Sequence, residues 1–448
     1  MGVSDDGPSV MESKLRRYPA FVRFWLASTV SDFGTYITTL AFSVLILVTM
    51  NGTPLDQGLV NAARWAPYLL FGLVAGVWID RFPRRTVLIG GDLGRGLILA
   101  GVCVTAVTGT ISVPTLMILM FVFGTLALTS DAAYQSFLPQ LVPRSLLIQA
   151  NARLQQSDTV AQTTGSAVAG GLVALVTAPV ALLVDAVTYF FSAAVLLTLE
   201  RPNAQAPVRT KQRLHRKVEE GLRWVYGHSH LAPLVWSTHI WFIGSAILGT
   251  VLPTVILNDL RVGALGLGLV MGCAGIGAVV GTTLSTRLGH RWGTGKAIVA
   301  ARLVQPFAIA LVAVAPLAAS GEHTGEIYGS PLHWPDVLWA AFALASLGQL
   351  LFGMAMGVEG PLEMGYQQAV TPDRLIARMS ATRRSVNRGM IVIGAPLGGF
   401  IATAAGTDTA LWAAAAFLLL ASLVLLLSKF RDARIEDQQL SDEEALIP

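Results

Sequence analysis

The chain has 448 residues, of which 53% are hydrophobic and only 13% are charged. A soluble domain of this length carries about twice that share of charged residues, so the composition excludes a soluble protein. Basic residues give a formal net charge of +4, but they gather between long apolar segments, which indicates membrane topology and not nucleic-acid binding.

Twelve apolar segments follow one another along the chain, separated by glycine, proline and charged residues. A membrane-crossing helix needs about 20 residues, and most of these segments are that long. The alternating pattern of a membrane β-barrel is absent from the sequence. We therefore predict an all-α integral membrane protein with twelve transmembrane helices, at residues 22–48, 58–80, 86–108, 113–137, 147–176, 180–199, 231–257, 265–288, 296–318, 337–358, 381–405 and 410–428.

Lys and Arg residues divide unevenly between the two sides of these segments. When both termini and every second connection are placed on one side, that side holds 27 of the 31 Lys and Arg residues. The opposite connections hold only Arg261. Because basic loops stay in the cytoplasm, we expect a multi-pass protein of the bacterial cytoplasmic membrane with both termini inside the cell.

One long polar connection divides the chain into two halves of six spans. It carries seven Lys and Arg residues and an amphipathic pattern around Val218, Leu222 and Val225, which predicts a helix at the membrane surface. The expected organisation is an N-terminal six-helix bundle (1–200), a cytoplasmic linker (201–230), a C-terminal six-helix bundle (231–428) and a cytoplasmic tail (429–448).

The two halves also share a local repeat. One offset of 229 residues aligns Pro143 with Pro372 and Gly165 with Gly394. Two pseudo-symmetric bundles related in this way are typical of alternating-access transporters, whose binding site lies between the halves near the middle of the membrane.

The segment GVWIDRFPRR, residues 76–85, follows the second span. It resembles the loop signature of the major facilitator superfamily. The stretches FVRFWLASTVSDFG, DAAYQSFLPQLVP, LVDAVTYFFSA and IGAPLGG are similar to the bacterial branch of enterobactin-exporter-like and macrolide-efflux-like proteins. The resemblance implies the major facilitator fold and transport driven by a proton gradient, without a cofactor.

The resemblance also implies a cytoplasmic gate built around this loop. Gly72 and Gly76 allow a close helix contact, and Asp80 can face the positive N-terminal end of the eleventh span. In the family, the position of Arg84 reaches an acid of the fourth span, which here is Asp131. The predicted gate comprises Gly72, Gly76, Asp80, Arg81, Arg84, Arg85 and Asp131; the alternative is that the arginines only set topology.

A second gate is expected in the C-terminal half. Glu359 and Glu363 lie at the cytoplasmic end of the tenth span, and a basic stretch precedes the eleventh. We expect these acids to pair with that stretch, which includes Arg378, Arg383, Arg384 and Arg388.

Ionisable residues inside spans are costly and usually functional. Asp32, in the first span, is the strongest candidate for proton coupling, and Asp185, in the sixth, is the second. An apolar surrounding favours the protonated form of a carboxylic acid, so such a group can exchange protons as access alternates. A structural role for Asp32 near Gly34 is the alternative.

Aromatic and polar residues in the spans suggest the lining of a substrate cavity. Bulky amphipathic molecules are held by apolar area and stacking, which Tyr36, His239, Trp241 and Phe242 can supply. Arg64 either joins this cavity or extends to the membrane interface.

Small residues in the fifth and eleventh spans predict close helix packing. The segments TGSAVAGG and GAPLGG resemble, in part, the fifth-span motif of drug antiporters. The first has Ser166 where that motif has proline, so packing and a kink explain Gly165, Gly170, Gly394, Pro396 and Gly398 better than a role in coupling does.

Taken together, these patterns predict a secondary active transporter that exports a drug, an antibiotic or a siderophore-like metabolite by proton antiport. The expected partners are this substrate, protons and membrane lipids, with no nucleic acid and a monomeric chain. The alternatives are a proton-coupled nutrient importer, a lipid flippase or a non-transporting sensor. An enzyme is not expected, because the sequence has no Walker motif, nucleophile elbow or metal-ligand spacing around Cys103 and Cys273.

Overall fold

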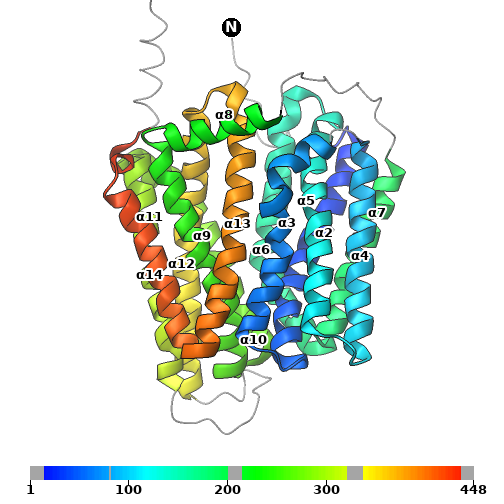
Figure 1. Cartoon of the computed structure of the whole chain (residues 1–448), viewed down its shortest axis with the longest axis vertical. Helices are drawn as coiled ribbons and strands as arrows, with labels where there is room; N and C mark the ends of the chain where they lie inside the picture. The colour runs from blue at the N-terminus through cyan, green and yellow to red at the C-terminus, as the bar shows by residue number, and fades with distance from the viewer. Residues whose placement is uncertain (1–14, 80–81, 200–213, 320–335, 435–448) are drawn as a thin grey trace, which may run out of the picture.

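The computed structural model describes residues 15–79, 82–199, 214–319 and 336–434, and within these ranges it contains helices but no strands (Figure 1). Twelve of the described helices have at least 20 residues. They are α2 (Pro19–Val44), α3 (Pro54–Ile79), α4 (Arg84–Val107), α5 (Val113–Phe137), α6 (Leu147–Val176), α7 (Ala178–Thr198), α9 (Leu231–Thr254), α10 (Gly263–Trp292), α11 (Thr294–Ala319), α12 (Asp336–Ala369), α13 (Asp373–Ala405) and α14 (Thr407–Leu426). The all-α prediction is confirmed.

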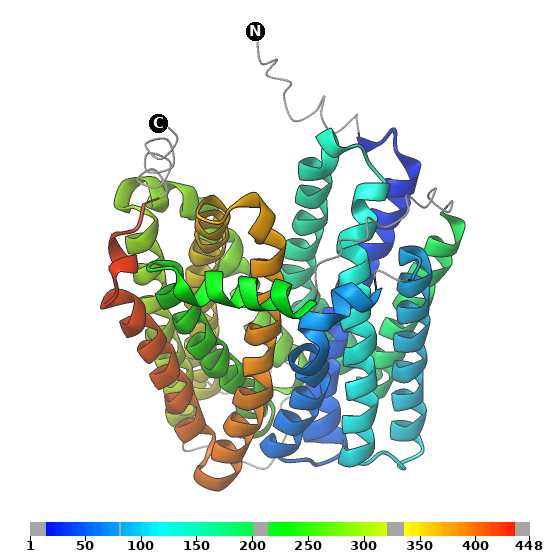
Figure 2. The ribbon, with the colours of Figure 1, turned by 45° about the horizontal axis from the view of Figure 1, so that its top comes forward.

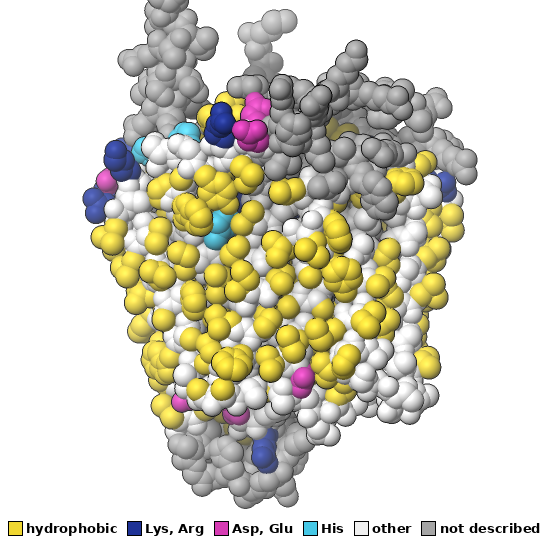
Figure 3. All heavy atoms as spheres, viewed as in Figure 1, with side chains coloured by type: hydrophobic (Ala, Val, Ile, Leu, Met, Phe, Trp, Pro, Cys, Tyr) yellow, Lys and Arg dark blue, Asp and Glu magenta, His cyan; other side chains and the backbone are white. Residues whose placement is uncertain are grey.

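The surface has the character of a membrane protein. Among the described residues, eleven helices are long and apolar enough to cross a membrane by length and composition. The 26-residue helix α3 occupies the position of the remaining predicted span. Figure 3 shows hydrophobic side chains covering the middle of one face, with the charged side chains gathered at its two ends.

Several helices are longer than the apolar runs predicted. The tenth predicted span ends at residue 358, but α12 continues to Ala369, and α13 begins at Asp373, eight residues before the predicted start. These extensions are polar, because they project beyond the hydrocarbon layer or line a cavity. Hydropathy marks only the part of a helix that faces lipid.

The helices form two bundles that lie side by side (Figure 1). Helices α2–α7 pack against one another, as do α9–α14, and the bundles meet mainly where α3 contacts α13 and α6 contacts α10. The offset of 229 maps α13 onto residues 144–176, which are α6 and the short 3-10 turn before it. The sequence repeat therefore corresponds to a repeat of structure.

The described chain begins at Leu15 and ends at Arg434 on the same face, here called the terminal face; the opposite face is called the distal face (Figures 1 and 2). On the distal side, π-helical turns extend α2 and α9, at Leu45–Thr49 and Val255–Asp259. Their first three residues are buried in one hydrophobic cluster that joins both bundles. The bundles are therefore sealed together at the distal face.

Glycine permits the closest contacts between the bundles. A Cβ atom on Gly170 of α6 would lie 2.6 Å from the carbonyl oxygen of Ala264 and 2.8 Å from the Cα of Gly268, both in α10. A Cβ atom on Gly58 of α3 would lie 2.9 Å from the carbonyl carbon of Ala395 in α13. Any larger residue would push the bundles apart at these points.

The helix predicted in the linker is α8 (Leu214–Gly227), which lies across the terminal face (Figures 1 and 2). It packs against α9 and α13. Val225 is buried against Val235 and Met379. The apolar side of this amphipathic helix therefore covers the C-terminal bundle.

We expect Gly170→Ala to lower the thermal unfolding temperature of the purified protein, because the added methyl group meets backbone atoms of α10. Gly171→Ala is the matched control: a Cβ at Gly171 has no neighbour within 4 Å. The control replaces a helical glycine and should raise stability by about 0.5–1 kcal/mol. Equal unfolding temperatures for the two variants would contradict the described interface.

Candidate transport cavity

Among the described residues, each bundle contributes the lining of a cavity. The first has a volume of about 380 Å³ and is lined by α2, α4, α5, α6 and α7. The second has a volume of about 390 Å³ and is lined by α9, α11, α12 and α13. Each is large enough for part of a drug-sized molecule.

Both cavities lie in the half of the protein nearer the terminal face. The lining residues fall within 24–35, 88–95, 130–134, 151–158 and 192–196 of the first bundle and within 238–242, 302, 356–364 and 380–388 of the second. In every helix these positions are near the end that reaches the terminal face. Since the distal side is sealed by apolar packing, this conformation offers access from the terminal face.

Asp32 lies in the first cavity, as the sequence predicts for a functional carboxylate. Its side chain is half-buried, and among the described residues it has no hydrogen-bond or ion-pair partner. Ser28 and Tyr36 lie one helical turn away on the same face of α2. The Ser28 hydroxyl lies 3.3 Å from the hydroxyl of Tyr134, and Tyr36 donates to Asp158 over 3.4 Å.

Asp158 of α6 is a second cavity carboxylate that the sequence analysis missed. It also accepts a hydrogen bond from Gln155 at 3.4 Å, and it lines the same cavity as Asp32. The polar start of α6 resembles a surface segment, which concealed it. Asp158 nevertheless lies inside a predicted span, and that was the available signal.

A third carboxylate of this cavity is neutralised locally. Asp92 and Arg95 of α4, three residues apart, form an ion pair of 2.5 Å. Asp92 also accepts a hydrogen bond of 2.7 Å from Ser192, and the Arg95 guanidinium lies 4.4 Å from the centre of the Tyr189 ring. The pair links α4 to α7 and contributes no net charge.

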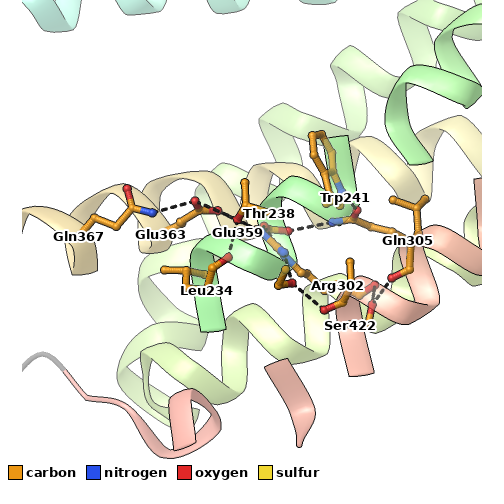
Figure 4. A network of polar contacts seen from close by, with 12 residues as sticks. Leu234, Thr238, Trp241, Arg302, Gln305, Glu359, Glu363, Gln367 and Ser422 are labelled. Carbon is orange, nitrogen blue, oxygen red and sulfur yellow. Dashed lines mark hydrogen bonds and ion pairs between the residues drawn. The ribbon is translucent and has the colours of Figure 1, made fainter. Parts of the chain in front are cut away.

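The second cavity is bordered by a buried network centred on Arg302 of α11 (Figure 4). Its guanidinium is 1% exposed and forms ion pairs with Glu359 at 2.5 Å and with Glu363 at 3.3 Å, both in α12. It also donates to the hydroxyls of Ser237 and Thr238 in α9.

Further contacts extend this network to neighbouring helices. Gln305 donates to Glu359 at 2.9 Å and accepts from the indole of Trp241. Ser422 of α14 donates to the backbone carbonyl of Arg302 at 2.8 Å. The network therefore holds α9, α11, α12 and α14 together from within.

Arg302 lies inside the predicted span 296–318, and no role was predicted for it. The rule that singled out Asp32, a charge within an apolar segment, applies equally to Arg302. Its partners, at positions 359 and 363, lie far along the chain in the next helix. Their distance in the sequence therefore does not indicate the pairing.

Comparison with known proteins agrees with this architecture. A family model of the major facilitator superfamily (MFS), described as transmembrane secretion effector, matches residues 14–321. The chain belongs to the major facilitator superfamily.

Individual relatives are distant. The chain is 24% identical over 391 residues to the uncharacterised MFS-type transporter y4rN of Sinorhizobium fredii, covering 87% of this chain and 90% of that protein. It is 28% identical over 220 residues to the multidrug efflux pump Tap of Mycobacterium tuberculosis, covering 47% of this chain and 51% of Tap. The solved structure of the nucleoside transporter NupG matches with a TM-score of 0.70 and 10% identity, over 91% of this chain and 98% of NupG. At that identity the likeness concerns the fold alone.

The MFS loop signature is only partly covered by the structure. Asp80 and Arg81 lie outside the described residues, and the contacts of Gly76 are not described either. Arg84 donates to the carbonyls of Ile79, at 2.6 Å, and Phe82, at 3.1 Å.

The predicted contact between Arg84 and Asp131 differs from the structure. Asp131 instead accepts a hydrogen bond of 2.7 Å from Tyr68 of α3. Arg85 donates to the carbonyls of Leu196, at 2.8 Å, and Leu197, at 2.7 Å. Arg85 therefore satisfies the unpaired carbonyls at the C-terminal end of α7.

The second predicted gate also needs correction. Glu363 pairs with Arg383 at 3.2 Å, as expected, but its other cation is Arg302. Arg388 does not pair with these acids: its guanidinium lies 4.2 Å from the centre of the Trp65 ring and 5.2 Å from that of Tyr68, across the bundle interface.

Two other arginines of this gate have different surroundings. The Arg384 guanidinium lies 2.9 Å from the side-chain amide of Gln135 in α5, when that amide is turned to present its oxygen. The side chain of Arg378 lies outside the described residues. The basic start of α13 therefore faces the other bundle as well as α12.

Asp185 and His239 do not line either cavity. Asp185 is fully buried and accepts hydrogen bonds from Thr38 and, at 2.8 Å, from Thr188, with Gly34 of α2 packed against it. This position favours helix packing over the predicted proton exchange.

His239 is buried between two partners, the Tyr226 hydroxyl of α8 at 2.8 Å and the Asn387 side chain of α13 at 2.9 Å. It therefore anchors α8 to the C-terminal bundle. This placement differs from the predicted one in the substrate cavity.

The remaining predicted cavity residues divide between the bundles. Trp241 and Phe242 line the second cavity, and the Trp241 ring stacks on Phe352 with 6.4 Å between ring centres. Arg64 lines neither cavity; its guanidinium lies 5.4 Å from the ring centre of Phe123. Tyr36 lies beside the first cavity through its contact with Asp158.

The small residues of α6 and α13 occupy close contacts, as the packing interpretation predicts. A Cβ at Gly165 would lie 3.1 Å from the Cβ of Tyr36 in α2. Gly394 and Gly398 face Ile243 and Ile247 of α9, and Pro396 approaches Gly58 of α3.

No group of three His, Cys, Asp or Glu side chains in the described ranges is arranged to hold a metal ion. The two cavities are lined by carboxylates, guanidiniums, hydroxyls and aromatic rings, among other groups.

We expect Arg302→Gln to destabilise the protein by about 3–5 kcal/mol, because it leaves two buried carboxylates without their cation. Arg383→Gln is the matched control: it removes a partner of Glu363, but its side chain is 29% exposed, so the cost should be about 1 kcal/mol or less. Thermal unfolding in detergent measures both. Unfolding of the Arg302 variant at the wild-type temperature would show that the network is not structural.

Proposed function

We propose that this MFS protein is a secondary active transporter that exports a hydrophobic or amphipathic small molecule in exchange for protons. It works by alternating access between the two bundles, as a monomer in a bacterial cytoplasmic membrane. The family, the fold and the two cavities support transport; the direction, the substrate class and the coupling ion belong to the proposal.

One observation carries the proton coupling. Asp32 presents a carboxylate to the cavity with no partner among the described residues, and Asp158 lines the same cavity, so two like charges share it. A proton bound at this pair relieves the repulsion, and so does a cationic group of a substrate. Proton and substrate therefore compete for one site, which is the requirement for antiport.

The orientation follows from the charge distribution. The terminal face is the face expected in the cytoplasm from the placement of Lys and Arg. In that orientation the described conformation opens toward the cytoplasm, where an exporter takes up its substrate. The multidrug efflux pump Tap, similar over about half of this chain, supports the same direction.

The lining of the second cavity supports an apolar or aromatic substrate. Trp241 and Phe242 lie on it together with Met356 and Met364. Aromatic rings supply rigid apolar area, and methionine adapts to different shapes.

The test uses inverted membrane vesicles of a host that overproduces the protein, with a panel of drugs and siderophores and an inward-acid proton gradient. We expect proton-driven accumulation of at least one compound and its collapse on addition of a protonophore. Asp32→Asn should abolish proton-driven accumulation, because the amide cannot exchange a proton. Glu219→Gln is the control, since Glu219 is exposed on α8 and pairs with Arg223, its one ionic partner among the described residues.

The gradient direction separates export from import. Accumulation in inverted vesicles driven by acid inside supports antiport, whereas efflux from loaded vesicles under the same gradient would indicate a proton-coupled importer. Full proton-driven accumulation by the Asp32 variant would contradict the coupling site.

A further inference from the structure

The two cavities carry unbalanced charges of opposite sign. In the first, Asp92 and Arg95 neutralise each other, which leaves Asp32, Asp131 and Asp158 without a cationic partner among the described residues. These three residues are called the acidic side. The same cavity holds the hydroxyl of Ser130, which is buried and has no hydrogen-bond partner in the described ranges.

In the second cavity, the acids and two of the arginines cancel. Glu359 and Glu363 are matched by Arg302 and Arg383. Two further lining residues, Arg384 and Arg388, have no carboxylate partner within the described part of the chain. They are called the basic side.

The acidic and basic sides approach each other at Asp131, across the bundle interface. Tyr68 connects them directly, since its hydroxyl donates to Asp131 and its ring lies under the guanidinium of Arg388. Arg384 approaches the side-chain amide of Gln135, which lies one helical turn from Asp131 on α5. Arg384 and Asp131 form no ion pair, so the space between them separates unpaired opposite charges.

Unpaired charges in a partly desolvated space are unfavourable until a ligand supplies the opposite charges. A purely cationic ligand satisfies the acidic side and leaves two guanidiniums unpaired. A purely anionic ligand does the reverse. A ligand with both charges satisfies both sides, and arginine is well suited to a carboxylate or phosphate because its donors form a fixed fork.

We propose that the two cavities together recognise one amphoteric substrate, with a basic amine bound at the acidic side, an anionic group bound at the basic side, and an aromatic or apolar body against Trp241 and Phe242. This inference rests on the proposed transport function and specifies its substrate class.

The test compares three related probes on the full-length protein in lipid nanodiscs. Norfloxacin carries an amine and a carboxylate on an aromatic body; its methyl ester lacks the anion, and its N-acetyl derivative lacks the cation. Equilibrium dialysis measures binding of each. We expect norfloxacin to bind about tenfold tighter than either derivative, the effect of one charge-assisted contact.

Variants test which residues bind the amine and which bind the carboxylate of norfloxacin. The double variant Arg384→Gln/Arg388→Gln should weaken norfloxacin and the N-acetyl derivative about tenfold and leave the ester unchanged. Asp32→Asn should weaken norfloxacin and the ester but not the N-acetyl derivative. Glu219→Gln should change none of them. If the double variant does not fold, the three-probe comparison on the wild type still decides.

Equal binding of the three probes, or no binding of any, would overturn the proposal. A uniform loss across all probes in the arginine variant would indicate that these charges only close the cavity. Proton-driven transport of the ester as fast as norfloxacin would overturn the inference and leave the transport function intact. A norfloxacin preference in binding without proton-driven movement of any probe would overturn the transport function alone.

Discussion

Contact between the two bundles depends on how closely backbones can approach. The bundles meet through α3 with α13 and α6 with α10, and on the distal side Gly170 and Gly58 bring helices together at distances that no Cβ atom would permit. Apolar packing inside a bilayer gains little from the hydrophobic effect, because lipid is as apolar as leucine, so close van der Waals contact has to supply the association. The distal seal therefore fixes where the cavities can open. The charged residues that line the two cavities lie toward the terminal face, where water and substrate have access.

The apolar interior also constrains where charged residues can lie within the bundles. A buried ion without partners is costly, and in the C-terminal bundle two carboxylates and two guanidiniums satisfy one another, with Arg302 at the centre. In the described part of the N-terminal bundle, Asp92 pairs with Arg95, and three carboxylates at the cavity have no cationic partner. The first arrangement stabilises helix packing, and the second leaves charge available to bind a ligand or a proton. The difference separates a structural network from a candidate binding site.

Much of the fold could be predicted from the sequence. Each span is recognised from the hydrophobicity of its own residues, and the even number of spans follows from counting them. Asp32 could be found because a single acid in an apolar run is rare and costly. The partners of the interior charges could not. Arg388 follows acids in the chain but contacts the rings of Trp65 and Tyr68 in the other bundle, and Asp131 bonds to Tyr68 and not to Arg84. Such pairings depend on which helices are neighbours and on how each helix is rotated about its axis. The spacing of residues in the sequence gives neither piece of information. Asp158 lies inside the predicted span 147–176, but several polar neighbours in the sequence made its carboxylate less conspicuous than that of Asp32.

The contacts across the interface show how the open and closed states of the proposed cycle can have similar free energies. On the terminal side the bundles are joined by stacking of Arg388 on two rings and by the approach of Arg384 to Gln135, contacts of about 1 kcal/mol each. Closing the terminal side brings the basic side nearer to the acidic side and strengthens their attraction, whereas opening exposes both to water. A substrate or a proton that neutralises one side changes that attraction by a few kcal/mol, which is enough to shift a two-state equilibrium by more than about tenfold. In the proposed cycle, ligand charge and access are therefore coupled through the same residues, and no separate transmission element is required.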